Sequence, residues 1–179
     1  MIKTILVCIT LSYVFLFAIE LQAQCPPDRL VFTTQSQIQD FVTDYPNCEE
    51  LNASLFIMGD QITDLSPLKN IRTIADSIVI QNTSLDEISM QNIERVGFRF
   101  LYLQNAAPNM SFPNLRFAQV LQFEEDDKLK EISLPSLDTV NSLNVSSCPN
   151  VSLVSFPSLS ECFSFFLGNE MGNLRTINI

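Results

Sequence analysis

The sequence predicts an all-β protein: a right-handed parallel β-solenoid with a short capping helix at its N-terminus. One observation is a set of apolar positions that recur every 22 residues, and another is a short alternating run in each repeat. A third is a segment before the first repeat whose apolar residues have helical spacing. We therefore interpret residues 1–24 as a signal peptide, 25–50 as a disulfide-closed cap and 51–179 as a solenoid of about six coils.

The repeat is clearest in three similar segments, SFPNL, SLPSL and SFPSL, whose prolines lie 22 residues apart. Two apolar columns keep this step through five repeats: Ile71, Ile93, Leu115, Leu137 and Leu159; and Ile74, Val96, Ala118, Val140 and Cys162. Columns that stay in phase indicate a repeat protein in which each coil buries its apolar side against its neighbours.

Each repeat also contains an alternating run that is typical of a β-strand. The runs are SLFI (54–57), SIVI (77–80), FLYL (100–103), VLQF (120–123), SLNV (142–145) and FFL (165–167). A repeat of 22 residues is shorter than the roughly 30 residues of a strand–helix–strand unit, so we expect the strands to stack into one parallel sheet. We place the last residue of each run, including Leu103, on the inward side.

Asparagines at the strand exits, Asn82, Asn105 and Asn169, can bond the turn backbone of stacked coils. Glu125 and Ser147 interrupt this series, so we expect a broken ladder.

The segment before the repeat predicts a cap. Residues 30–32 form an expected edge strand, and Thr34 or Ser36 can begin a helix that ends at Tyr45-Pro46. The apolar face of this helix consists of Ile38, Phe41 and Val42. No comparable cap follows the last repeat, so we expect a fragment of a longer array; the alternative is an end that a partner protects.

Residues 1–24 have the layout of a secretory signal peptide. Lys3 precedes an apolar run from Thr4 to Ile19, and cleavage after Ala23 would place a small residue at the scissile bond. The alternative is an uncleaved membrane anchor, for which the run is short. We therefore expect a secreted or cell-surface protein with no membrane span in the mature chain.

Four cysteines remain after such cleavage, and in an exported chain an even number suggests disulfides. Four cysteines allow three pairings, and we prefer Cys25–Cys48 because both flank the amphipathic segment. Cys148 and Cys162 stay open, since Cys162 lies at an inward position and can equally be a buried thiol.

Composition excludes several functions. The net charge is −10, which argues against nucleic acid, and the absence of histidine removes imidazole catalysis and histidine metal sites. The acidic run Glu124–Asp127 lacks the spacing of a calcium loop, so we interpret it as a solvated turn. We expect no cofactor, no metal and no enzyme. A polysaccharide-acting enzyme has little support, because the acids lie in turns of different coils with no repeated pairing.

The outward strand residues are the candidate ligand face. With the apolar columns facing inward, the residues that face outward are Phe56, Val79, Tyr102, Gln122, Asn144 and Phe166. The apolar or aromatic members of this set are the site candidates: Phe56, Val79, Tyr102 and Phe166. Loops that cover this stripe, or β-propensity alone, are the alternative explanations. On this hypothesis, serine at Phe56 and Tyr102 abolishes binding without unfolding.

Several segments resemble a known family. CPP at the mature N-terminus, TTQSQIQDFVTDYPNC (33–48), ITDLSPLKNIRTI (62–74) and SIVIQNTSLDEI (77–88) are similar to secreted bacterial surface proteins with receptor-L-domain-like, leucine-rich-type repeats. The resemblance covers about residues 25–179, and extends more distantly to the L domains of growth-factor-type receptors. It implies leucine-rich-type coils, a disulfide-closed cap and a binding or adhesion role. The family's glycine pair is present only in part, as Val96-Gly97-Phe98.

These observations predict a non-catalytic binding or adhesion module for a protein or carbohydrate at the cell surface. The alternative is a structural cell-envelope or matrix protein without a discrete ligand.

Overall fold

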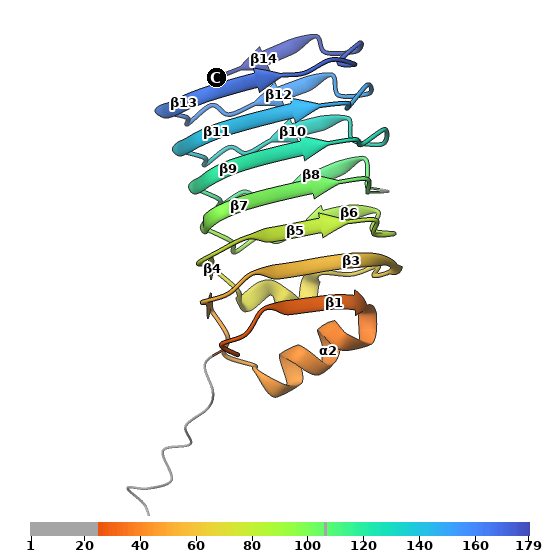
Figure 1. Cartoon of the computed structure of the whole chain (residues 1–179), viewed down its shortest axis with the longest axis vertical. Coiled ribbons are helices and arrows are strands. Elements are labelled where there is room, and N and C mark those ends of the chain that lie inside the picture. The colour runs from red at the N-terminus through yellow and green to blue at the C-terminus, as the bar shows by residue number, and fades with distance from the viewer. Residues whose placement is uncertain (1–24, 106) are drawn as a thin grey trace, which may run out of the picture.

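The computed structural model describes residues 25–105 and 107–179, so the predicted signal peptide lies outside the described residues. The chain is mostly β, with one short α-helix near the N-terminus (Figure 1). The elements are β1 (Leu30–Thr34), α2 (Gln35–Asp44), β2 (Glu50–Leu51), β3 (Leu55–Gln61), the 3-10 helix η1 (Ser66–Asn70), β4 (Thr73–Ile74), β5 (Ile78–Gln81), β6 (Glu87–Ser89), β7 (Arg95–Leu103), β8 (Asn109–Ser111), β9 (Phe117–Glu124), β10 (Glu131–Ser133), β11 (Thr139–Ser146), β12 (Leu153–Ser155), β13 (Glu161–Leu167) and β14 (Thr176–Asn178). Among the described residues, no helix has the length and apolar character needed to cross a membrane.

One long parallel sheet organises the molecule. Its strands follow the order β1-β3-β5-β7-β9-β11-β13, and the short strands β2 and β4 extend it to nine. Shorter parallel sheets, β6-β8 and β10-β12-β14, lie behind it (Figure 1). The expected parallel sheet is confirmed, and the stacking is consistent with a β-solenoid-like arrangement.

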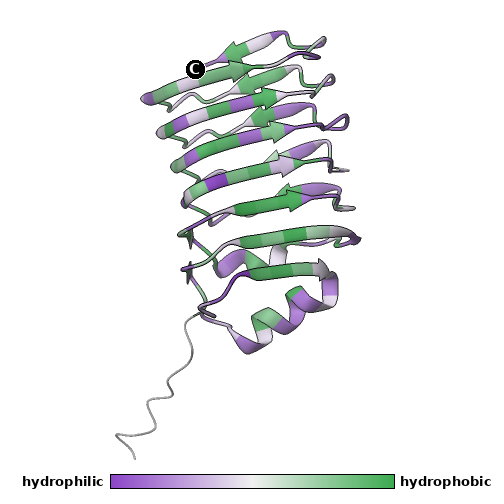
Figure 2. Cartoon of the chain, in the orientation of Figure 1, coloured by the Kyte–Doolittle hydropathy of each residue, from purple (hydrophilic) through white to green (hydrophobic). Residues whose placement is uncertain are grey.

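The inward columns form the core. In the column that begins at Ile71, every residue before Leu159 is at most 1 % exposed. In the column that begins at Ile74, every residue before Cys162 is fully buried. Hydrophobic residues also run along most of β1, β3 and β5 (Figure 2). Cys162 is in register with buried Val140 but is itself exposed, which contradicts the buried alternative for this thiol. The reason is that β13 is the last strand of the described sheet, so its inward side has a neighbour on one side only.

The predicted phase of β7 is wrong by one residue. Ile80 is in register with Tyr102, and Tyr102 with Phe123, so Tyr102 occupies the inward column and Leu103 does not. Tyr102 is accordingly 0 % exposed. All four residues of the run FLYL are apolar or aromatic, so alternation could not reveal which of them point inward.

The N-terminal cap forms as expected. Thr34 is the N-cap of α2, and its hydroxyl and the Gln37 side chain complete a capping box. Ile38 and Phe41 are the buried residues of α2, and the Phe41 ring lies 5.5 Å from that of Phe32 in β1. The helix therefore covers the end of the sheet at β1 (Figure 1).

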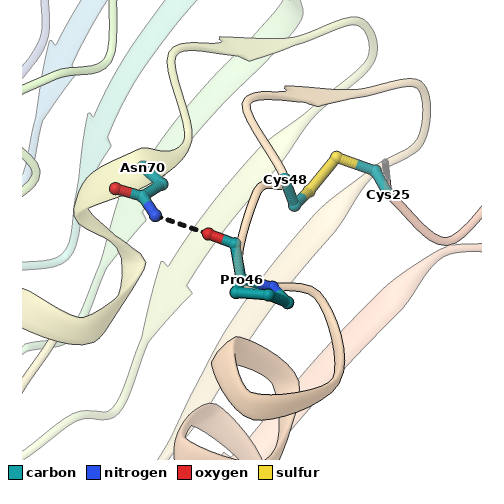
Figure 3. The surroundings of a disulfide bond; sticks show 4 residues. All are labelled: Cys25, Pro46, Cys48 and Asn70. Carbon is teal, nitrogen blue, oxygen red and sulfur yellow. Dashed lines mark hydrogen bonds between the residues drawn. A yellow bond between two sulfur atoms is a disulfide. The ribbon is translucent and has the colours of Figure 1, made fainter. Parts of the chain in front are cut away.

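The predicted Cys25–Cys48 disulfide is confirmed, and it ties the start of the cap to the chain that follows α2 (Figure 3). Nearby, the Asn70 amide donates to the Pro46 carbonyl at 2.7 Å. Cys148 and Cys162 are both free, and Cys148 is the buried one. Burial raises the pKa of the Cys148 thiol to about 11, which keeps it protonated and unreactive at neutral pH.

An asparagine ladder at one corner was missed. Asn70, Asn92 and Asn114 recur every 22 residues. Asn70 donates to a backbone carbonyl of the cap, and Asn92 and Asn114 each donate to one of the preceding coil, at 2.7–2.8 Å. Their spacing in the sequence was the signal that could have revealed them.

Candidate functional site

The outward side of the long sheet holds the candidate ligand residues. Register places one residue of each strand in a single row, which we call the outer row: Val31, Phe56, Val79, Leu101, Gln122, Asn144 and Phe166. Val31 is 41 % exposed and Phe166 58 %, whereas Phe56 and Leu101 are half-buried. The row is apolar over β1 to β7 and polar on β9 and β11.

The four predicted candidates have different positions. Phe56 and Val79 are neighbours in the outer row, although Val79 is only 8 % exposed. Phe166 belongs to the same row but lies on β13, four strands from Val79, and the polar residues on β9 and β11 separate them. Tyr102 was placed wrongly, and Leu101 takes its position.

Tyr102 instead belongs to the core. Its hydroxyl donates to the Ala107 carbonyl at 3.1 Å, and its ring centroid lies 6.1 Å from that of Phe123. Burial raises the pKa of Tyr102, and the charge of Asp126 adds to the shift. The buried hydroxyl therefore acts as a structural donor.

The amide nitrogens in the polar part of the outer row are bonded within the chain. Gln122 Nε2 and Asn144 Nδ2 both donate to Glu124 Oε1, at 2.6 and 3.2 Å. These two NH2 groups are thus occupied by a neighbouring carboxylate, whereas Asn144 Oδ1 is buried and has no hydrogen-bond partner among the described residues. The apolar part from β1 to β7 is the better candidate for contact with a partner, because its side chains are partly exposed.

Arginines flank this apolar part, and sequence reasoning missed them. Arg29 lies over the Phe56 ring at 5.3 Å, Arg95 over Phe117 at 3.9 Å and Arg99 over Phe98 at 5.8 Å, each measured from the guanidinium carbon to the ring centroid. Arg95 and Arg99 belong to the RVGFRF segment of β7, where basic and aromatic residues are interleaved in the sequence.

These arginines have no carboxylate partners within the described chain. In residues 25–105 and 107–179, the ion pairs join Arg72 to Glu94 and Lys128 to Asp127, and Arg29, Arg95 and Arg99 take part in neither. Their charge is therefore available to another molecule.

A shallow groove of about 450 Å³ lies at the strand exits, lined by residues such as Asp60, Asn82, Gln104 and Glu125. Gln104 Nε2 donates to Glu125 Oε2 at 2.8 Å across it. The described ranges contain no group of three His, Cys, Asp or Glu side chains arranged to hold a metal ion.

A buried polar ladder lies beside this groove. Thr83 donates through its backbone N–H and its hydroxyl to Asn105 Oδ1, and the Asn105 N–H donates to Asp126 Oδ2 at 2.8 Å. Asp126 Oδ1 accepts from the N–H groups of Lys128 and Leu129. The ladder therefore joins three coils through Thr83, Asn105 and Asp126. Each of these residues lies three positions after an inward residue, Ile80, Tyr102 or Phe123, whereas Asn82 and Glu125 lie two positions after it.

Two sequence predictions are corrected by this ladder. Asn82 does not join Asn105 in one ladder, because Thr83 is the residue that bonds Asn105. Asp126 is not part of a solvated turn, since it is 0 % exposed. Burial raises the pKa of Asp126 above its ordinary value, although the three N–H donors oppose the shift.

We expect Asp126→Asn to lower the free energy of unfolding by about 1–3 kcal/mol, because an amide leaves a buried N–H group without an acceptor. Urea denaturation measures this, with Asp127→Asn at an exposed neighbour as control. An equal effect of the two substitutions would contradict the ladder.

The stability that Asp126→Asn loses should also depend on pH. Because the folded-state pKa of Asp126 is raised, its contribution to stability is present below the unfolded pKa of about 3.9 and is lost as pH rises through the folded pKa. The free energy of unfolding of the wild type should therefore exceed that of Asp126→Asn most near pH 3 and less near pH 7. Denaturation curves recorded across this range measure the difference. A difference that grows with pH would contradict the assigned direction.

The fold and the outer face define a class, a parallel β-sheet protein of stacked repeats with a helix at one end. Comparison with protein-family models, with curated proteins and with solved structures finds no match. The functional proposal therefore depends on the residues of this chain.

Proposed function

We propose that this protein is a non-catalytic binding or adhesion module that works outside the cytoplasm. The observation that carries the proposal is the outer row from β1 to β7, where Val31, Phe56 and Leu101 lie partly exposed. Beside them are arginines that form no ion pair with any described residue. Apolar side chains on a solvent-facing sheet, flanked by arginine, are typical of interaction surfaces.

The compartment follows from two features. Residues 1–24 have the layout of a signal peptide, and the Cys25–Cys48 bridge suits an oxidising compartment. We propose a secreted or cell-surface location.

We also propose that the coils are right-handed and of the leucine-rich, receptor-L-domain type. Connections between parallel strands of one sheet are almost always right-handed. The helix α2, with its disulfide beside the first coil, supports the resemblance to that family.

The second candidate is a structural protein of the cell envelope or matrix without a discrete ligand. The observation that favours it is the corner ladder of Asn70, Asn92 and Asn114, which ties three successive coils to one another and to the cap. Such coupling suits a load-bearing element as well as a binding scaffold.

The test combines Phe56→Ser with Leu101→Ser. A random-peptide phage library and a panel of defined polysaccharides supply the probes, and affinities are measured by biolayer interferometry. We expect any saturable ligand of the wild type to bind the double variant at least about tenfold more weakly, because the variant loses the apolar centre of the face.

Leu153→Ser is the matched control, since Leu153 is a half-buried leucine on the separate sheet of β12. Binding that survives in the double variant would place the site elsewhere. The absence of any saturable ligand for the wild type would favour the structural alternative.

A further inference from the structure

We propose that the partner is a protein with an acidic surface, and that Arg29, Arg95 and Arg99 bind its carboxylates. This inference rests on the proposed function, because it names the partner of the same outer face.

The stacked arginines are suited to carboxylates. A guanidinium that lies over an aromatic ring keeps its N–H edges free for paired hydrogen bonds with a carboxylate. Arg95 has the closest stacking, at 3.9 Å from the Phe117 centroid. Stacking also restricts the side chain before binding, which reduces the entropy that is lost on association.

The backbone of β7 presents two of these arginines on one strand. The register between β7 and β9 shifts between Val96 and Arg99, so a bulge separates the two arginine positions. Gly97 lies at this bulge, packed so closely on the Ala75 backbone that a side chain would not fit. The bulge turns Phe98 outward, where it is 44 % exposed beneath Arg99.

The three arginines border the apolar part of the outer row on one side, because Arg29 precedes Val31 and Arg95 and Arg99 precede Leu101 in parallel strands. Arg29 directly precedes β1, which lies three strand spacings, or about 14 Å, from β7 in the sheet. Phe56 on β3 and Val79 on β5 lie between these two strands in the outer row. An apolar centre with arginine at its edges is the usual anatomy of a protein interface.

Charge favours an acidic partner of limited size. The chain carries a net charge of −10, yet β1, β5 and β7 contain no Asp or Glu, and β3 contains only Asp60, near its C-terminal end. Asp28 and Glu94 directly precede Arg29 and Arg95, and Glu94 is paired with Arg72. The patch is therefore a small basic island with acidic residues at its border. A long polyanion would extend beyond this island and meet acidic residues such as Glu124 on β9, whereas a compact acidic surface would not.

The side chains in and next to the outer row also favour protein over sugar. The residues Val31, Met58 and Leu103 add aliphatic side chains to the face. Such groups pack against apolar protein side chains, and they do not hydrogen-bond the hydroxyls of a polysaccharide.

The experiment selects peptides of about twelve residues from a random phage library on the full chain and then tests them on two triple variants. One variant is Arg29→Gln, Arg95→Gln and Arg99→Gln. The control, Lys69→Gln, Arg116→Gln and Lys130→Gln, changes the net charge equally at exposed positions outside the patch. Thermal melts of both variants check the fold.

We expect the wild type to select peptides that combine Asp or Glu with apolar residues. These peptides should bind the patch variant at least about tenfold more weakly and the control within about twofold, and their affinity should fall as salt rises. Selection of neutral or basic peptides, of no peptides, or equal binding to both variants would overturn the inference.

Two further results separate this inference from the proposed function. If Phe56→Ser with Leu101→Ser abolishes peptide binding while the arginine variant retains it, the proposed face stands and the acidic-partner inference fails. If neither change affects binding, both fail. Saturable binding of polygalacturonate, but not of dextran or of acidic peptides, would replace the protein partner with an acidic glycan.

Discussion

Tyr102→Ser is expected to lower the free energy of unfolding by about 3–5 kcal/mol, whereas Leu101→Ser one residue earlier should cost about 1 kcal/mol or less. Tyr102 is 0 % exposed and is among the largest fully buried side chains of the described chain. Its loss leaves a cavity beside Phe123 and also removes the donor to the Ala107 carbonyl. Leu101 points outward in the outer row and is half-buried.

Urea denaturation monitored by circular dichroism measures both substitutions. Tyr102→Phe separates the two causes, because it keeps the ring and loses the hydrogen bond, which should cost only about 1 kcal/mol. If Leu101→Ser were the more damaging change, the register of β7 would be shifted by one residue. Serine at Tyr102 therefore cannot serve as a test of binding, contrary to the expectation from sequence.

Removal of the Cys25–Cys48 disulfide should have the second large effect on stability. The bridge closes a sequence separation of 23 residues, and the chain-entropy model assigns about 3 kcal/mol to a loop of this size. This loop contains β1 and α2, and β1 pairs with β3. Without the bridge, the cap formed by β1 and α2 is held on β3 by noncovalent contacts alone. Cys25→Ala with Cys48→Ala should therefore lower the unfolding midpoint in a thermal melt.

Cys148→Ala, at a buried thiol without a disulfide, is the control for the loss of a cysteine side chain. Hydrogen exchange should show the largest loss of protection in β1 and α2, because this segment depends on the bridge. A double variant that melts like the wild type would show that packing of Phe32 and Phe41 alone holds the cap.

Local patterns in the chain were sufficient to predict much of the fold. The 22-residue columns identified the inward positions, and the capping residues of α2 and the pairing of Cys25 with Cys48 followed from nearby residues. The outward residue was predicted correctly on five strands. On these strands, polar and apolar residues alternate or the repeat keeps its 22-residue spacing. These features depend on short-range chemistry or on a period, and both are visible in one sequence.

The candidate site was predicted less completely. Phe56, Val79 and Phe166 belong to the outer row, but Tyr102 does not, because a run of four apolar residues has no preferred phase. The arginine contacts join residues from neighbouring strands, such as Arg95 and Phe117, and no local pattern specifies them.

The sequence by itself determined the repeat, the parallel strands, the cap and its disulfide, because each follows from periodic burial or from residues close together in the chain. Only the tertiary structure decided which residues of β7 face inward, how Thr83, Asn105 and Asp126 join into a buried ladder, and which aromatic rings the arginines stack on. The physical reason is that these features depend on the register between neighbouring strands, and a single-residue change in a turn alters that register without altering the pattern within any one strand.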